Sequence, residues 1–77
     1  MIVDVQLLGT LSEYSPTGNE KFTLELLPEA TVVQLLEKIL FPEDIEKMIL
    51  VNGHRAQPST RLAEGDEVFI FAPAAGG

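Results

Sequence analysis

The dipeptide Gly76-Gly77 at the C-terminus is the part of this sequence best suited to chemistry. Glycine has no side chain, so the pair could pass through a channel that any Cβ atom would block. The carboxylate of Gly77 would then lie in another protein's active site, since backbone donors can capture C-terminal carboxylates. We expect 1–72 to fold and 73–77 to form a flexible tail, spanning roughly 16 Å when extended. The tail residues expected to thread the channel are Pro73, Ala74, Ala75 and Gly76.

No other group of residues has the spacing of an active site. The six glycines do not form a phosphate-binding loop. His54 is the only histidine and has no second ligand at metal-binding spacing, so we expect a solvated turn residue and no metal site. Ser12, Ser15 and Ser59 have no nearby base that could activate them. We therefore expect no catalytic residue and no bound cofactor, and a chain that is not an enzyme on its own.

Composition and charge exclude several classes of protein. The 77 residues, 45% of them hydrophobic, make one small globular domain. The absence of cysteine excludes disulfides and a thiolate nucleophile. A net charge of -7 argues against nucleic acid and anionic membranes as partners. We find no signal peptide and no apolar stretch near the ~18 residues of a membrane span, so we expect a cytoplasmic protein.

Two alternating runs in the first third of the chain predict a pair of strands. Residues 2–8 and residues 21–26 both alternate apolar and polar side chains, which is the period of a half-buried strand. The segment 9–20 between them is polar and contains Pro16 and Gly18, so we expect a loop. Two successive strands most simply pair as an antiparallel hairpin.

Residues 32–40 predict an amphipathic helix. Their apolar side chains recur at i, i+3, i+4, i+7 and i+8, which places them on one face. Thr31 is a favourable N-cap, and Gln34 three residues later completes a capping-box pattern. Pro42 should end the helix. We expect a further short helical turn at 43–47.

The last part of the chain predicts three short strands joined by tight turns. The apolar run 48–51 leads into Asn52-Gly53, a strong signal for a two-residue hairpin turn. A return strand should follow at 54–57. A second turn at Gly65-Asp66 precedes the last strand, 67–72.

The strand 67–72 is apolar on both faces, although a single helix can cover only one face of a small sheet. Phe69 and Phe71 should therefore lie on the uncovered face. There they would be covered by loop residues such as Tyr14 or Leu11, be ordinary exposed apolar side chains, or form an apolar patch that binds a partner.

The order strand, strand, helix, strand, strand and Gly-Gly resembles the ubiquitin-like proteins, and it is most similar to the sulfur carriers of the MoaD/ThiS family. The resemblance spans essentially the whole chain. Its most specific part is the run L-x-E-G-D-E-V together with the terminal Gly-Gly. The residues that carry it are 30–32 and 35–36 at the helix start, 51–53 at the turn, 62–68, and 71–77.

The resemblance implies an α+β fold of the ubiquitin-like β-grasp type. Such a fold has a mixed sheet of four to five strands, with the first and last strands parallel at its centre. One main helix packs on one face of that sheet.

The resemblance also implies a reaction at the terminus. A ubiquitin-activating-type adenylyltransferase would use ATP to adenylate Gly77, and a persulfide donor would supply sulfur to form a thiocarboxylate. Within the family, the segment 10–14 and the run Phe-x-Pro before the tail are similar to the small subunits of molybdopterin synthases. The acceptor would then be the large subunit of molybdopterin synthase, or another sulfur acceptor enzyme.

One stretch departs from the pattern of those small subunits. They commonly carry two prolines and a valine before Gly-Gly, whereas this chain has Ala-Pro-Ala-Ala at 72–75. The acceptor therefore stays open, with thiamine thiazole, tRNA thiolation and tungsten cofactor as other destinations of the sulfur. A non-covalent ubiquitin-like interaction module and a protein modifier joined through Gly77 are two further alternatives.

Overall fold

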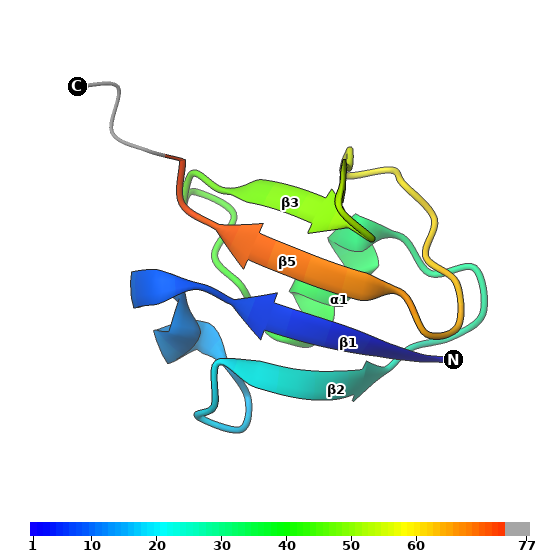
Figure 1. Cartoon of the computed structure of the whole chain (residues 1–77), viewed down its shortest axis with the longest axis horizontal. Coiled ribbons are helices and arrows are strands. Elements are labelled where there is room, and N and C mark those ends of the chain that lie inside the picture. The colour runs from blue at the N-terminus through cyan, green and yellow to red at the C-terminus, as the bar shows by residue number, and fades with distance from the viewer. Residues whose placement is uncertain (74–77) are drawn as a thin grey trace.

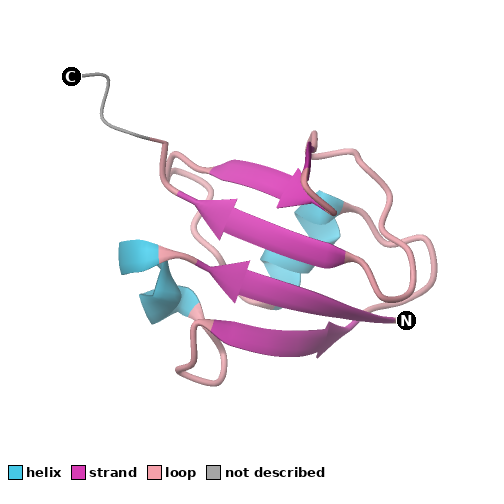
Figure 2. Cartoon of the chain, viewed as in Figure 1, coloured by secondary structure: helices cyan, strands magenta, loops and turns pink. Residues whose placement is uncertain are grey.

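Within residues 1–73, which the computed structural model describes, five β-strands form one sheet and a single α-helix crosses one of its faces (Figure 1). The elements are β1 (Ile2–Leu7), the 3₁₀ helix η1 (Gly9–Tyr14), β2 (Lys21–Glu25), α1 (Val32–Lys38), β3 (Met48–Val51), β4 (His54–Arg55) and β5 (Glu67–Phe71). Figure 2 shows the same elements separated by class, with the sheet as one layer and α1 as the other.

The sheet has the order β2-β1-β5-β3-β4, with β5 in its centre. β1 and β5 run parallel, and β2 pairs antiparallel with β1, as the two alternating runs predicted. β3 pairs antiparallel with β5 on its other side. The parallel first and last strands, the mixed sheet and the single covering helix confirm the predicted β-grasp fold.

The hydrophobic core lies between the sheet and α1. Alternate side chains of β1 and β5 point toward the helix, and the apolar face of α1 packs against them. No polar side chain is buried among residues 1–73, so apolar packing holds the two layers together. The largest fully buried side chains are Leu7, Leu35, Ile70, Val3, Val5, Val32 and Val68.

Helix α1 begins with the predicted capping box. The N–H of Gln34 donates to Oγ1 of Thr31 (3.4 Å), and the N–H of Thr31 donates to Oε1 of Gln34 (2.8 Å). Because the first N–H groups of a helix have no partner within it, these two bonds stabilise its start.

The end of α1 lies at Lys38 rather than at the predicted residue 40. Leu40 has a φ of 57°, in the left-handed region. The next N–H, that of Phe41, donates to the carbonyl oxygen of Leu36 (2.9 Å). This is the Schellman arrangement that closes a helix, at a position where glycine is usual. Pro42 disfavours helical backbone at Phe41, the residue before it, so the helix could not continue beyond Leu40 in any case.

Replacing Leu40 with glycine should raise the free energy of unfolding by about 1 kcal/mol. The Leu40 side chain is 85% exposed, so the substitution removes little packing while it relieves the left-handed backbone. Thermal unfolding followed by circular dichroism should show a Tm higher by roughly 4–8 °C. Lys38→Gly, in the last helical turn, is the matched control and should lower the Tm. An unchanged Tm for Leu40→Gly would show that the left-handed backbone of Leu40 does not destabilise the domain.

Two segments differ in type from the prediction, and every strand except β3 ends one or two residues earlier than predicted. The segment 9–14, expected as loop, forms η1 because the apolar side chain of Leu11 turns into the core. The segment 43–47, expected as helix, contains only a turn and a bend, and Ile45 within it packs against the core. β4 is shorter than 54–57, and β5 ends one residue before 72, close to a proline that cannot donate to the ladder.

Candidate functional site

The candidate site begins where the described structure ends. Gly77, Gly76, Ala75 and Ala74 lie outside the described residues, so their roles stay predictions. Pro73 is half-buried and follows the end of β5 after one intervening residue. The C-terminal end of β5 therefore fixes the point from which the predicted reactive segment leaves the domain.

β5 is held from both sides. Its neighbours are β1, in parallel, and β3, in antiparallel. Beyond the end of β1, the N–H of Leu8 still donates to the carbonyl oxygen of Ile70 (2.9 Å). A shift of this strand would break hydrogen bonds in two ladders, so the start of the C-terminal segment has a fixed position.

The segment 62–68, which reads L-x-E-G-D-E-V, anchors the start of β5. Oδ1 of Asp66 accepts a hydrogen bond from Nδ2 of Asn52 (2.9 Å), and its Oδ2 accepts one from the N–H of Ala63 (2.7 Å). Oδ1 of Asn52 in turn accepts from the N–H of Glu67 (2.9 Å). Asn52 begins the predicted tight turn between β3 and β4, with a φ of 52°. The two predicted turns are thus joined to each other by side chains.

Replacing Asp66 with alanine should lower the free energy of unfolding by about 1–3 kcal/mol. The substitution leaves the N–H of Ala63 and the amide of Asn52 without the acceptors they have in the native structure. Urea denaturation would measure the loss. Glu67→Ala, next in the chain and with an exposed side chain, is the control and should change stability by less than about 0.5 kcal/mol. Equal losses for both variants would argue against the anchoring role.

The face of the sheet turned to the viewer in Figure 1 carries no helix. The side chain of Phe69 is 38% exposed on this open face, and Phe71 shares the face and is half-buried. In register beside them on β3 lie Leu50 and Met48, both half-buried. We call these four side chains the open-face patch. It lies at the end of the sheet from which the C-terminal segment leaves.

The loop residues considered as covers for the phenylalanines pack elsewhere. Leu11 is buried in the core, and the ring of Tyr14 packs against Phe41, with ring centroids 5.0 Å apart. Desolvation of this phenol, and then the carboxylates of Glu13 and Asp44, raise the pKa of Tyr14, so its hydroxyl stays protonated at neutral pH. Tyr14 is therefore unsuited to act as a base.

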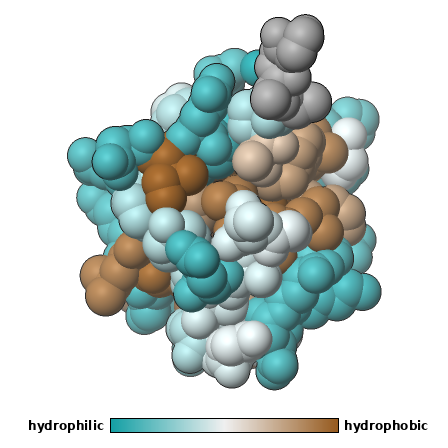
Figure 3. All heavy atoms as spheres, turned by 90° about the vertical axis from the view of Figure 1, so that its left-hand side faces the viewer, coloured by the Kyte–Doolittle hydropathy of each residue, from teal (hydrophilic) through white to brown (hydrophobic). Residues whose placement is uncertain are grey.

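Polar side chains border the open-face patch on both sides. Gln6 lies opposite Phe69 on β1, and its Nε2 donates to Oε1 of Glu20 (2.7 Å). Arg55 lies opposite Leu50 on β4. Figure 3 shows hydrophobic patches bordered by hydrophilic side chains at the end of the molecule where β5 finishes. An apolar centre with a polar rim is typical of protein docking surfaces.

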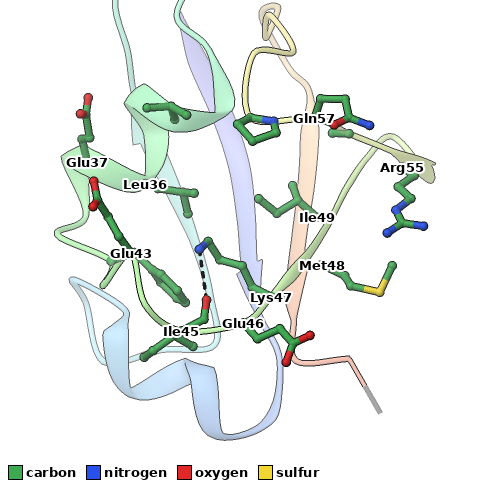
Figure 4. A pocket seen from close by; sticks show the side chains of 14 residues that line it. Leu36, Glu37, Glu43, Ile45, Glu46, Lys47, Met48, Ile49, Arg55 and Gln57 are labelled. Carbon is green, nitrogen blue, oxygen red and sulfur yellow. Dashed lines mark hydrogen bonds between the residues drawn. The ribbon is translucent and has the colours of Figure 1, made fainter. Parts of the chain in front are cut away.

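A groove of about 440 Å³ lies between α1, the segment 42–47 and β3 (Figure 4). Leu36 and Ile49 contribute apolar lining, and Nζ of Lys47 donates to the carbonyl oxygen of Ile45 within it (3.2 Å). Met48 lines the groove and also belongs to the open-face patch, so the two surfaces meet there. The sequence did not predict this groove, because the spacing between α1 and β3 has no local pattern. The charged side chains that line it are Glu37, Glu43, Glu46, Lys47 and Arg55.

The described part of the chain has neither a metal-binding cluster nor a membrane-spanning helix. Among residues 1–73, no three His, Asp or Glu side chains gather in a way that could hold a metal ion. No helix in that range has the length and apolar character needed to cross a membrane. His54 is exposed at the start of β4, directly after the tight turn.

A family model and several solved structures are similar to this chain over almost its whole length. The family model of the ThiS family matches residues 5–77. A candidate molybdopterin converting factor subunit 1 of Pyrococcus furiosus is similar in structure, with a TM-score of 0.81 and 25% identity over 95% of this chain and 98% of that one. No curated protein sequence matched the chain.

Two further solved structures have the same fold. SAMP1 of Haloferax volcanii aligns with a TM-score of 0.78 and 25% identity over 100% of both chains. A complex of subunits 1 and 2 of the molybdopterin-converting factor of Helicobacter pylori contains a chain that aligns with a TM-score of 0.63 and 24% identity, again over 100% of both.

Proposed function

The chain belongs to the ThiS family of ubiquitin-like sulfur carriers, and from this membership we propose that it carries sulfur as a thiocarboxylate on Gly77. The observation that carries the proposal is the family match, which runs from residue 5 to residue 77 and so includes Gly76-Gly77. The position of β5 supports it, since this central strand leads directly to Pro73 and the segment beyond.

The proposed reaction makes a poor electrophile reactive. The Gly77 carboxylate attacks the α-phosphorus of ATP, pyrophosphate leaves, and an acyl-adenylate forms. The terminal sulfur of a persulfide donor then attacks the acyl carbon, and AMP leaves. A thiol cleaves the resulting acyl disulfide and releases the thiocarboxylate. Because this chain has no cysteine, the sulfur donor and the reducing thiol both belong to partners.

The first partner is a ubiquitin-activating-type adenylyltransferase, which binds the ATP and holds the catalytic groups. The open-face patch is the surface on which it docks. Phe69 offers the most exposed ring of that patch and lies beside Leu50 on β3. A docked partner is thereby placed next to the point where the C-terminal segment leaves the domain.

The acceptor that we favour is the large subunit of molybdopterin synthase, so that the sulfur enters the molybdenum cofactor. Support comes from the similarity to the candidate converting factor subunit 1 of Pyrococcus furiosus. The Helicobacter pylori structure is a complex of that type of subunit with subunit 2. Carriers for thiamine thiazole, tRNA thiolation or a tungsten cofactor are the alternatives within the family.

A protein modifier is the second candidate function. The similarity to SAMP1, which belongs to the small archaeal modifier proteins, favours it. In that case Gly77 forms an isopeptide bond with a lysine of a target protein, and AMP again leaves. The same activated terminus serves both functions, and only the nucleophile differs.

Intact mass spectrometry distinguishes these functions. The chain is incubated with an adenylyltransferase of the family, ATP and a persulfide donor, followed by a thiol. Exchange of one oxygen for sulfur at Gly77 supports the carrier, and a lysine-linked adduct supports the modifier. A chain that gains neither adenylate nor sulfur would leave only a non-covalent interaction module.

Docking of the carrier should depend on salt. Each chain has a net charge of -7, which steers it toward a basic surface around the partner's active site. Stopped-flow measurement should show an association rate constant that falls as ionic strength rises from about 0.05 M to about 0.5 M, while the dissociation rate changes less. An association rate that does not respond to salt would exclude electrostatic steering.

A further inference from the structure

β2 forms one edge of the sheet, and the structure leaves that edge open. In the order β2-β1-β5-β3-β4, β2 pairs with β1 alone. Figure 1 shows its outer edge at the border of the molecule, with no element beside it. β2 contains no proline, and its register with β1 runs without a bulge from Lys21 to Glu25. It therefore lacks two of the devices that prevent edge strands from pairing.

The backbone groups that face outward from β2 can be assigned from the ladder. Residues 1 and 26 exchange both of their hydrogen bonds, and the N–H of Leu7 donates to the carbonyl oxygen of Glu20. In an antiparallel pair, bonded positions alternate along each strand, so the even-numbered residues of β2 bond to β1. The N–H and C=O groups of Lys21, Thr23 and Glu25 consequently point away from the sheet.

We propose that β2 pairs antiparallel with β2 of a second copy of this chain, about a twofold axis through Thr23. In this register Lys21 of each copy lies opposite Glu25 of the other, and Thr23 lies opposite itself. All three residues have outward-facing backbone groups, so about six backbone hydrogen bonds can form. The two sheets join into one continuous sheet.

Charge complementarity selects this register. Lys21 and Glu25 are both exposed on the open face, so each dimer contains two opposite-charge pairs. Moving the second strand by two residues leaves the charged groups opposite neutral ones. Moving it by four residues places Lys21 opposite Lys21, or Glu25 opposite Glu25. Only the register centred on Thr23 pairs all charges with their opposites.

Packing on the other face of β2 favours the same register. Phe22 is buried and Leu24 is half-buried, and both side chains point toward the helix side of the sheet. The twofold axis places Phe22 of each copy opposite Leu24 of the other. Pairs of aromatic and aliphatic side chains across neighbouring strands stabilise sheets. The half-exposed side of Leu24 is thereby covered.

The second copy leaves the candidate site free. The open-face patch is centred on β5 and β3, and β1 separates these strands from β2. Pro73 lies beyond β5. The dimer can therefore dock a partner at each patch, and the inference is independent of the proposed sulfur chemistry.

Sedimentation velocity and amide hydrogen exchange test the proposal on the complete chain. We expect a dimer whose fraction rises with concentration up to about 1 mM. The amides of Lys21, Thr23 and Glu25 should gain protection over the same range. Sedimentation of a monomer only, or protection confined to another surface, would overturn the proposal. Protection of these amides only when another protein's strand is added would overturn it in favour of a hetero-complex.

Charge reversal makes the test specific. Lys21→Glu and Glu25→Lys should each weaken self-association by about tenfold or more, because both charge pairs become repulsive. An equimolar mixture of the two variants should dimerise again, since every Glu then faces a Lys. Lys38→Glu, on α1, is the control with the same change in charge and should associate like the parent. Failure of the mixture to associate would reject the register.

A proline substitution tests the backbone pairing of β2 directly. Thr23→Pro removes an N–H that points away from β1, so the monomer should keep its circular dichroism spectrum while it no longer dimerises. Undiminished association of a folded Thr23→Pro chain would reject pairing through β2.

Discussion

Removing Gly77 should abolish thiocarboxylate formation and leave the Tm unchanged. The deletion moves the terminal carboxylate back by about 3.5 Å, the length of one extended residue. Misplacement of a reacting group by 1 Å can already lower a rate about a hundredfold, so no sulfur exchange should be detected. The core is built from residues between Val3 and Ile70, so its packing is untouched. Intact mass and a thermal melt of the same sample measure both effects.

Two substitutions in the tail test whether a side chain blocks the channel, which deletion of Gly77 cannot distinguish from a loss of length. Gly76→Ala adds one methyl group where the channel should tolerate none, whereas Ala75→Gly removes one from the neighbouring position. The first should lose sulfur transfer and the second should keep it. Equal sulfur transfer by the two variants would show that the partner's channel does not require a residue without a side chain at position 76. A large fall in Tm for the Gly77 deletion would contradict a tail without structural role.

Replacing Phe69 with aspartate should abolish binding to the adenylyltransferase. A buried aromatic anchor at an interface typically contributes about 2–4 kcal/mol, and a carboxylate in its place also has to be desolvated. We expect affinity to fall at least a hundredfold in a calorimetric titration. The ring is 38% exposed on the open face, so the domain should stay folded.

Val33→Asp provides the control for this substitution. Val33 is 40% exposed, nearly the same as Phe69, but it lies on α1 behind the sheet. An aspartate in the first turn of a helix also suits the helix dipole. This variant should bind like the parent. Unchanged affinity of Phe69→Asp, or equal losses for both variants, would remove the open-face patch as the docking surface.

Most elements of this fold were predictable, because a local period, a turn signal or a local bond encodes them. Alternation gives β1 and β2, and the capping box of Thr31 and Gln34 gives the start of α1. The errors have two causes. The burial of Leu11, a tertiary contact, converts a polar loop into η1. The end of α1 is set by the left-handed backbone of Leu40, at a position where glycine would have been the usual signal.

The candidate site was predictable in part, for a similar reason. Phe69 and Phe71 could be placed on the uncovered face because their strand is apolar on both sides. Leu50 and Met48 could not be added, since an apolar run such as 48–51 shows no preferred face. Their position depends on the register of β3 against β5, which joins residues far apart in the chain. The groove beside α1 depends on the same long-range packing.

The parallel pairing of β1 with β5 has a mechanical consequence. The chain enters at the start of β1 and leaves at the end of β5, and these two points lie at opposite ends of the sheet (Figure 1). A force that pulls the two apart loads the hydrogen bonds between these strands in shear, so that they resist together. Pulling two strands apart from one end would instead break their bonds one after another. A pull on the C-terminal segment against the start of β1 is therefore resisted by all of these hydrogen bonds at once.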